Sequence, residues 1–114
     1  MTVTEVRRVV DELVAEVMNG GFDQYFFNSA GDDAPAAIQA LNAIGAAKTA
    51  ALLAKACATF LGGRPSPDWF KRQADLLDRV NPRFEVFEEL DKAFYAYPDD
   101  LESLMDAYET RSSR

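Results

Sequence analysis

The sequence has no histidine and only one cysteine, Cys57, among its 114 residues. Without an imidazole, the Ser-His-Asp and Cys-His nucleophilic arrangements and histidine zinc sites are excluded within this chain. One thiol forms neither an intramolecular disulfide nor a thiolate metal cluster, so we expect Cys57 to be a small core residue. The sequence therefore predicts a non-enzymatic protein with no catalytic residue, metal or cofactor.

Long apolar runs are also missing. No uninterrupted apolar stretch approaches the roughly 18 residues of a transmembrane helix, and no charged-then-apolar leader opens the sequence. We therefore expect neither export nor a membrane span, and a single thiol suits the reducing cytoplasm. Apolar residues still make up 48% of the chain and recur periodically, which predicts one folded domain over residues 1–114.

Basic residues are scarce between residues 85 and 109, where nine acids and one base, Lys92, give a net charge of −8. Acids, in turn, are missing from residues 34–67, which contain Lys48, Lys55 and Arg64. The whole chain has a net charge of −7. Direct nucleic-acid binding is disfavoured, because affinity for DNA depends on cations that replace condensed counterions. We expect a bipolar molecule.

The residues that are present follow helical periods, and no strand pattern of any length is found. Turns at "NGG", "SAGDDAP" and "GGRPSP", together with Pro82 and Pro98, divide the sequence. The sequence predicts an all-α, compact single-domain bundle of about six helices. The expected helical segments are 3–18, a short turn at 22–28, 35–44, 46–61, 67–80, 82–97 and 101–110, with residues 111–114 as a frayed tail.

The apolar spacing also predicts which side of each helix is buried. Segments 35–44 and 46–61 are alanine-rich and are expected to form the central layer. Arg72 is expected on a polar face of segment 67–80, paired with Asp68. The inward residues of that segment are expected to be Trp69, Phe70, Ala74, Leu77 and Val80. Those of segment 82–97 are expected to be Phe84, Phe87, Leu90, Phe94 and Tyr97.

The stretch "NGGFDQYFFNSAGDD", residues 19–33, interrupts this helical pattern. Gly20 and Gly21 permit backbone angles that other residues avoid, so they are expected to end the first helix. The aromatic residues after them return to the core at about one helical turn. The side-chain amides satisfy backbone groups left unpaired in a tight connection. The motif predicted to be structural consists of Asn19, Gly20, Gly21, Phe22, Gln24, Tyr25, Phe26 and Asn28.

A polar pocket is the functional alternative for the same stretch, with Asp23, Gln24 and Asn28 around a small ligand. A hard cation held by carboxylates is also open in principle. Its candidate ligands are Glu12, Glu16, Asp23, Asp32 and Asp33. The alternating ligand spacing of a calcium-binding hand is missing, however, and Asp32 and Asp33 are better explained as caps of the helix that begins near Pro35.

Three segments carry a resemblance: "NGGFDQYFFNSAGDD", "ALNAIGAAKTAALL" and "LDKAFY". Together they resemble the bacterial domain family named after a DNA-mimic protein, over about residues 5–110. The combined signature is Asn-Gly-Gly-Phe-x-Gln-Tyr-Phe-x-Asn. The resemblance implies an all-helical fold, a homodimer, and binding to DNA-binding proteins in place of DNA.

The acidic segment supplies the predicted partner-binding residues. Glu102, Asp106 and Glu109 share one helix face at spacings of four and three, where like charges cost about 0.2 to 0.5 kcal/mol per pair, so helix stability does not explain them. We expect carboxylates to occupy cationic subsites of a DNA-binding regulator, a nucleoid protein or another basic protein surface. The residues are Glu85, Glu88, Glu89, Asp99, Asp100, Glu102, Asp106 and Glu109.

Two other functions fit the sequence. One is a specific partner-binding or immunity-type module that acts through shape and apolar contacts, with Trp69 or Tyr95 as anchors. It predicts weak salt dependence, whereas the carboxylate hypothesis predicts strong salt dependence. The other is a small-ligand or metal-binding protein that uses Asn19, Gln24 and Asn28.

Overall fold

The computed structural model describes residues 1–113, and within that range it has six α-helices and no strand. They are α1 (Val3–Phe27), α2 (Ala34–Ala43), α3 (Ala47–Ala58), α4 (Trp69–Asp75), α5 (Glu88–Tyr95) and α6 (Leu101–Ser112). Two 3₁₀-helices, η1 (Ser29–Asp33) and η2 (Leu61–Gly63), and a π-helix, η3 (Leu76–Val80), complete the chain. The all-α prediction is confirmed.

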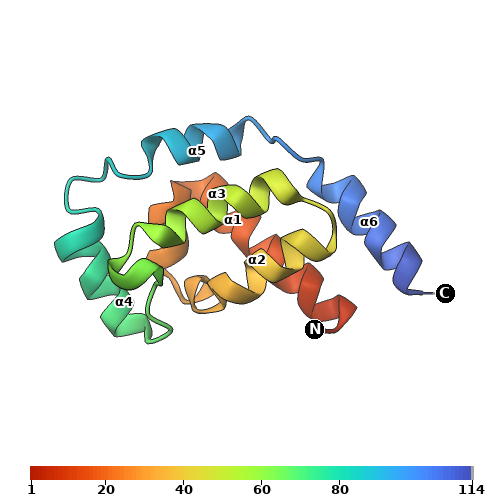
Figure 1. The fold of residues 1–114 in the computed structure, drawn as a ribbon, viewed down its shortest axis with the longest axis horizontal. Coiled ribbons are helices and arrows are strands. Elements are labelled where there is room, and N and C mark those ends of the chain that lie inside the picture. Colours follow the sequence, from red (N-terminus) through yellow and green to blue (C-terminus); the bar gives the residue numbers. More distant parts are fainter. Residues whose placement is uncertain (114) are drawn as a thin grey trace.

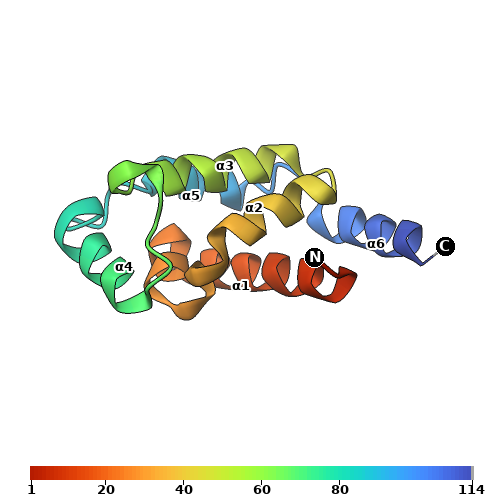
Figure 2. The ribbon, with the colours of Figure 1, turned by 60° about the horizontal axis from the view of Figure 1, so that its bottom comes forward.

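The molecule is elongated, with extents of 47 × 28 × 22 Å along its principal axes. Figures 1 and 2 show α4 at one end of the long axis and α6 at the other. α6 continues through Ser112, two residues beyond the segment expected at 101–110, and Arg114 lies outside the described residues. Among residues 1–113, no helix has the length and apolar character needed to cross a bilayer.

The core is built on α1 and a cluster of aromatic rings. Five phenylalanine rings lie at centroid distances of 4.9 to 6.4 Å, mostly tilted or edge-to-face, the geometries that aromatic pairs prefer. They come from α1, the turn after α3, and the α5 region, so the cluster joins distant parts of the chain. The rings belong to Phe22, Phe26, Phe60, Phe87 and Phe94.

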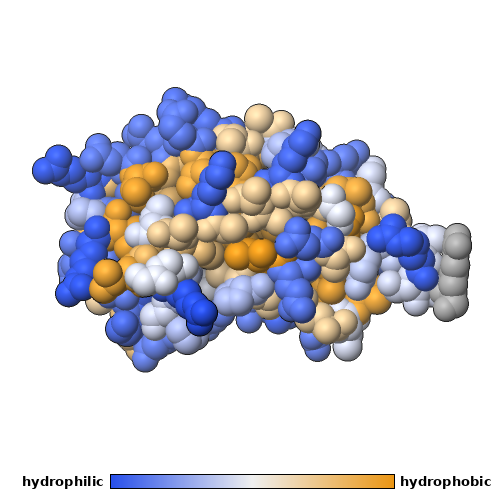
Figure 3. Space-filling view, in the orientation of Figure 1, coloured by the Kyte–Doolittle hydropathy of each residue, from blue (hydrophilic) through white to orange (hydrophobic). Residues whose placement is uncertain are grey.

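The alanine-rich helices α2 and α3 are not the central layer. Each buries one alanine face against the core, including Ala37 of α2 and Ala50 of α3. The other side of the pair is on the surface, where Figure 3 shows a weakly hydrophobic band along α3 bordered by hydrophilic side chains. The prediction of a central layer was wrong because α1 and its aromatic cluster supply the larger buried side chains.

The helix predicted over residues 67–80 begins later and turns a different face inward. Asp68 caps it by accepting a hydrogen bond from the Lys71 amide at 3.1 Å. Arg72 is fully buried, whereas Trp69 is 41% exposed and Phe70 is 78% exposed. Ala74 and Leu77 are also exposed. The predicted face was wrong because Arg72 meets backbone carbonyls that only the tertiary fold brings beside it.

The helix predicted over residues 82–97 shortens to α5. Asn81 is buried and its side chain holds a non-helical turn, accepting a hydrogen bond from the Val86 amide at 3.0 Å and donating one to Asp23 at 2.8 Å. Phe84 has φ 56° and is 66% exposed, and Tyr97 has φ 54° and is 42% exposed. Their predicted burial was wrong, because left-handed turns on either side of α5 direct them outward.

Candidate interaction surface

The two glycines after Asn19 interrupt α1 as predicted: both have non-helical backbone angles, so two helical segments meet at a kink within Val3–Phe27. Gly21 has φ 73° and ψ −175°, and the chain resumes a helix through Phe27. A Cβ on Gly21 would lie 2.4 Å from Oδ2 of Asp91. The Phe22 amide donates a hydrogen bond to Oδ1 of Asp91 at 2.9 Å. The glycine therefore gives an α5 carboxylate room to bind an amide that the kink leaves unpaired.

Asp91 is a structural residue of this site that no sequence pattern indicated. Burial raises its pKa, and the hydrogen bond from Phe22 opposes that shift. Its partner lies 69 positions away in the sequence, so no local pattern reveals the contact. The only indication is its membership of the acidic segment, where it looks like any other surface acid.

The three amides of the motif gather around Glu16. Asn28 and Gln24 each donate a hydrogen bond to Oε2 of Glu16, at 2.8 and 3.0 Å. Asn19 donates to Gln24 at 3.1 Å. Asp23, the third residue of the predicted polar pocket, accepts instead from Asn81. The amides therefore brace the kink from both sides, and Asp23 is not part of their cluster.

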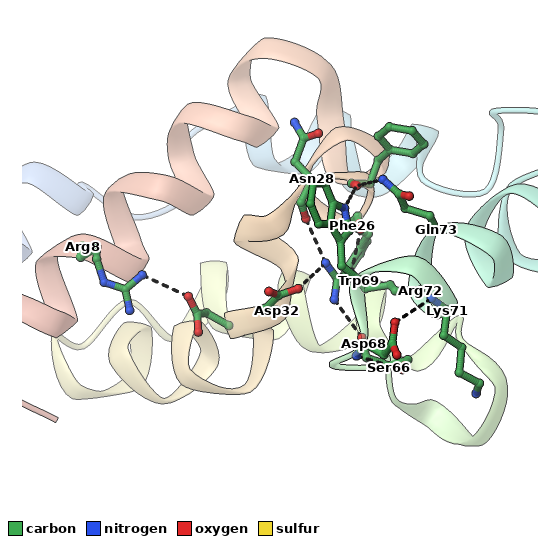
Figure 4. Close-up of polar contacts among 12 residues, drawn as sticks. Arg8, Phe26, Asn28, Asp32, Ser66, Asp68, Trp69, Lys71, Arg72 and Gln73 are labelled. Carbon is green, nitrogen blue, oxygen red and sulfur yellow. Dashed lines mark hydrogen bonds and ion pairs between the residues drawn. The ribbon is translucent and has the colours of Figure 1, made fainter.

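Arg72 joins α4 to the loop after α1 (Figure 4). Its Nε donates to the Phe26 carbonyl at 2.7 Å, and its Nη1 donates to the Ser66 carbonyl at 2.9 Å. Its Nη2 reaches the Asn28 carbonyl at 3.0 Å and Asp32 at 2.7 Å. The guanidinium is completely buried, while the Asp32 side chain is 43% exposed. A planar group with five donors suits this arrangement, in which three carbonyls and a carboxylate converge.

Of the five carboxylates suggested for a cation, three bind arginines, and Glu16 and Asp23 accept hydrogen bonds from side-chain amides. Asp33 contacts Arg8 at 3.1 Å and Glu12 contacts Arg8 at 3.3 Å, while Asp32 contacts Arg72. Asp33 precedes α2, but its side chain makes no capping hydrogen bond, so the predicted capping role was wrong. Across residues 1–113, no group of three or more acidic or thiol side chains is arranged to hold a metal ion.

Two of the predicted partner-binding acids support helix ends. Asp99 accepts hydrogen bonds from the amide and hydroxyl of Thr49 near the start of α3, at 2.7 and 2.8 Å. Asp100 caps α6 by accepting from the Ser103 amide at 3.2 Å and its hydroxyl at 2.9 Å. Each of these carboxylates already interacts with the positive end of a helix dipole, so less of its negative charge is available to pair with a cation of a partner.

The acids of α6 meet a cation from the other end of the sequence. Arg7 of α1 donates two hydrogen bonds to Glu109 and lies 3.5 Å from Asp106 and 3.7 Å from Asp11. The hydrogen bond raises the pKa of Arg7 and lowers the pKa of Glu109. At pH values above the ordinary pKa of a glutamate, the contact therefore stabilises the fold. This stabilisation is lost as the pH falls through the lowered pKa of Glu109.

The remaining predicted acids stay exposed. Glu85 and Glu88 precede or begin α5 and form no ion pair among the described residues, and the same is true of Glu102 on α6. Glu89 lies 3.5 Å from Lys92, but both side chains are more than 70% exposed, and such a pair contributes little. The structure thus separates the eight predicted acids by environment.

A hollow of about 360 Å³ lies between α1 and α6. We call it the α1–α6 groove. Its apolar lining includes Val10, Val14, Leu101 and Met105, and Tyr97 lies at its wall. Asp11, Glu102 and Arg7 supply its polar lining. An apolar floor bordered by carboxylates is suited to an amphipathic cationic segment.

Tyr97 has a structural link to this groove. Its left-handed backbone follows the end of α5, a position usually taken by glycine or asparagine. Its hydroxyl accepts a hydrogen bond from the Glu102 amide at 3.3 Å, at the start of α6. Sequence periodicity assigned Tyr97 to the core, and no local signal indicated that it belongs to a groove wall.

Cys57 is buried as predicted, and burial raises the pKa of its thiol to about 11. Because the thiolate is the reactive form, alkylation by N-ethylmaleimide at pH 8 should be about tenfold or more slower than that of a small model thiol. The rate should keep rising with pH up to about pH 11. A stopped-time mass-spectrometric assay would measure it. A rate that levels off below pH 9 would contradict the raised pKa.

These features define a small all-helical domain whose buried polar side chains brace loops and helix ends, with unpaired carboxylates on its surface. A family model described as DMP19-like protein matches residues 8–113, and the chain belongs to this family. The sequence resemblance predicted membership of a DNA-mimic family, and this prediction was wrong, because the family model that matches is the DMP19-like one. The DMP19-like family is itself DNA-mimic-like and of unknown function. Searches of curated proteins and of solved structures found no match.

Proposed function

We propose that this chain is a non-enzymatic protein-interaction domain that binds a basic segment of a partner protein in the α1–α6 groove. The observation that carries the proposal is that the apolar floor of the groove lies beside several carboxylates and a single cation, Arg7. The groove is one of several shallow hollows on the surface. Another hollow places Glu85 beside Val80 and Val86, but Glu85 is its single acid and Arg83 lines the same hollow.

The charge at the groove favours a cationic partner. Four carboxylates border or adjoin it, namely those of Asp11, Glu102, Asp106 and Glu109. Three of them share the guanidinium of Arg7, and Glu102 forms no ion pair among the described residues. The local net charge is therefore −3. A lysine or arginine of the partner would pair with the unneutralised carboxylates and stack on the exposed ring of Tyr97.

DNA mimicry is a narrower form of the same function. A surface built for about 6 to 10 phosphates needs more carboxylates than one groove provides. Glu85, Glu88 and Glu89 beside α5 would have to take part, or a second copy of the chain would have to contribute its own set. In this form the partner is the cationic surface of a DNA-binding regulator or nucleoid protein, and the active species is a homodimer. A cytoplasmic location is proposed with it, since a lone thiol suits a reducing compartment.

Replacing Glu102 with glutamine and Asp106 with asparagine tests the groove. The probe is a short fluorescein-labelled peptide with lysines along one helical face and leucines along the other. We expect binding about fivefold weaker in the double variant, measured by fluorescence anisotropy at low salt, because two rim charges are removed. Binding to the unmodified chain should also weaken steeply as salt is raised.

The matched control replaces Glu5 with glutamine and Asp78 with asparagine. Both are exposed acids that form no ion pair among residues 1–113 and line no hollow at the groove, and the net charge changes equally. Similar losses in the two double variants would mean that general charge, and not the groove, attracts the peptide. That outcome would reject the proposed site.

A second candidate is the apolar interaction module. Trp69 and Phe70 stack at a centroid distance of 5.9 Å, and Phe70 and Leu77 lie exposed about two turns apart on one side of α4 and η3. Exposed aromatic residues of this kind are frequent binding anchors. Partner binding through this face would persist at high salt, which distinguishes it from binding through the α1–α6 groove.

A further inference from the structure

The loop over residues 61–67 separates two neighbouring hollows near α4. One, of about 430 Å³, is lined mainly by apolar groups that include Pro35, Ile38 and Cys57, and its one acid, Asp32, is paired with Arg72. The other, of about 400 Å³, is lined by Leu61, Lys71 and Arg79 among others. Arg64, Pro65 and Pro67 line both. The two hollows are therefore adjacent parts of one surface, which we call the loop-61–67 surface.

This surface carries the opposite charge to the molecule as a whole. Three cations, Arg64, Lys71 and Arg79, line the second hollow with one acid, Asp75. Asp75 pairs with Lys71 at 3.8 Å, whereas Arg64 and Arg79 form no ion pair within residues 1–113. The hollow thus has a net charge of +2 in a chain whose net charge is −7. Charge complementarity calls for an anionic ligand.

The loop also exposes apolar and backbone groups. The side chain of Leu61 is 79% exposed. Gly62 and Gly63 have φ 76° and 74°, and no atom lies within 4 Å of the position that a Cβ would take on either. Bare backbone at two consecutive residues allows a ligand to approach the main chain closely. The loop is held from beneath by the hydrogen bond from Arg72 to the Ser66 carbonyl.

We propose that the loop-61–67 surface binds a short acidic segment of a partner protein that carries one large apolar side chain. Carboxylates of the segment pair with Arg64 and Arg79, and its apolar side chain enters the hollow beside Ile38 and Cys57. Nucleic acid is disfavoured, because three cations are few for a duplex and the net charge of −7 repels a polyanion. The inference does not rest on the α1–α6 groove, which different residues line.

A charge-matched pair of double variants tests the cationic part. The probe is a short fluorescein-labelled peptide in which glutamates flank a Leu-Phe pair. Replacing Arg64 and Arg79 with glutamine should weaken binding about tenfold at low salt, as measured by fluorescence anisotropy. Replacing Lys48 and Lys55 with glutamine should change it less than about twofold. Both lysines are exposed and line neither hollow, and the net charge changes equally.

Cys57 supplies an independent readout of the apolar part. Saturating peptide should slow alkylation of the Cys57 thiol, measured at pH 9, by about fivefold, because the inserted side chain covers it. A peptide with glutamines in place of the glutamates should not slow the alkylation of Cys57. The proposal is overturned if both double variants lose binding equally, if Cys57 is not protected, or if the chain self-associates through Arg64 and Arg79. It is also overturned if a short single-stranded DNA binds there as tightly as the peptide.

Discussion

Replacing Arg72 with methionine is expected to lower the free energy of unfolding by about 3 to 5 kcal/mol. Methionine fills much of the same space but donates no hydrogen bond. The carbonyls of Phe26 and Ser66 would then lose this donor, the Asn28 carbonyl would keep only the Gly31 amide, and Asp32 would lose its cation. A buried carbonyl without a partner costs about 1 to 3 kcal/mol. Because the group is fully buried, water cannot replace the lost contacts without opening the loop.

Urea denaturation followed by far-UV circular dichroism would measure the change, with Trp69 fluorescence as a local report beside the site. Arg79 is the matched control: it is an exposed arginine on the adjoining π-helix and forms no ion pair within the described residues. Its replacement with methionine should alter stability by less than about 0.5 kcal/mol. A loss below about 1 kcal/mol in the Arg72 variant would show that the loop does not depend on the guanidinium.

Replacing Gly21 with alanine is expected to lower the free energy of unfolding by about 3 kcal/mol. Alanine is unfavourable at φ 73°, and its Cβ would lie 2.4 Å from the carboxylate of Asp91. The carboxylate would have to move away from the Phe22 amide, which would leave that amide unpaired. Both penalties act at the kink that directs Phe22 into the aromatic cluster.

Gly62 provides the comparison for that substitution. Its φ of 76° is almost the same, but its ψ is 6°, in the left-handed helical region, whereas the ψ of Gly21 is −175°. No atom lies within 4 Å of the position of a Cβ on Gly62. Replacing it with alanine should therefore cost only the left-handed backbone term, about 1 kcal/mol. Thermal and urea unfolding of both variants would compare an open left-handed position with one whose backbone angles and contact with Asp91 both oppose a Cβ. Equal losses in the two variants would rule out a special role for the contact between Gly21 and Asp91.

The fold could be predicted well where local pattern was sufficient. The segments expected at 35–44 and 101–110 correspond to α2 (Ala34–Ala43) and α6 (Leu101–Ser112). The valines of α1 are buried on the expected side. Prediction was wrong at α4, because the hydrophobic period ranks Trp69 and Phe70 above an arginine for burial. A local period cannot register that carbonyls from another part of the chain will satisfy Arg72.

The candidate site was predictable only in part, for a similar reason. Counting charges identified the acids of α6, but not Arg7, which lies about a hundred positions away and neutralises part of them. The segment charge of −8 was correct as a sum, yet Asp91, Asp99 and Asp100 within it bind amides of the protein itself. Charge is additive along a sequence, whereas the availability of a carboxylate depends on its neighbours in space.

By itself the sequence determined that the chain is helical, where most helices lie, and that it has no histidine or paired thiol for imidazole or thiolate chemistry. These properties depend on composition and on contacts within a few residues. The tertiary structure alone decided which polar groups are buried, which acids remain unpaired, and that a cationic loop and an acidic groove form from different parts of the chain. Such outcomes depend on hydrogen bonds and ion pairs between residues far apart in sequence, whose energies follow from distance and burial and leave no local pattern.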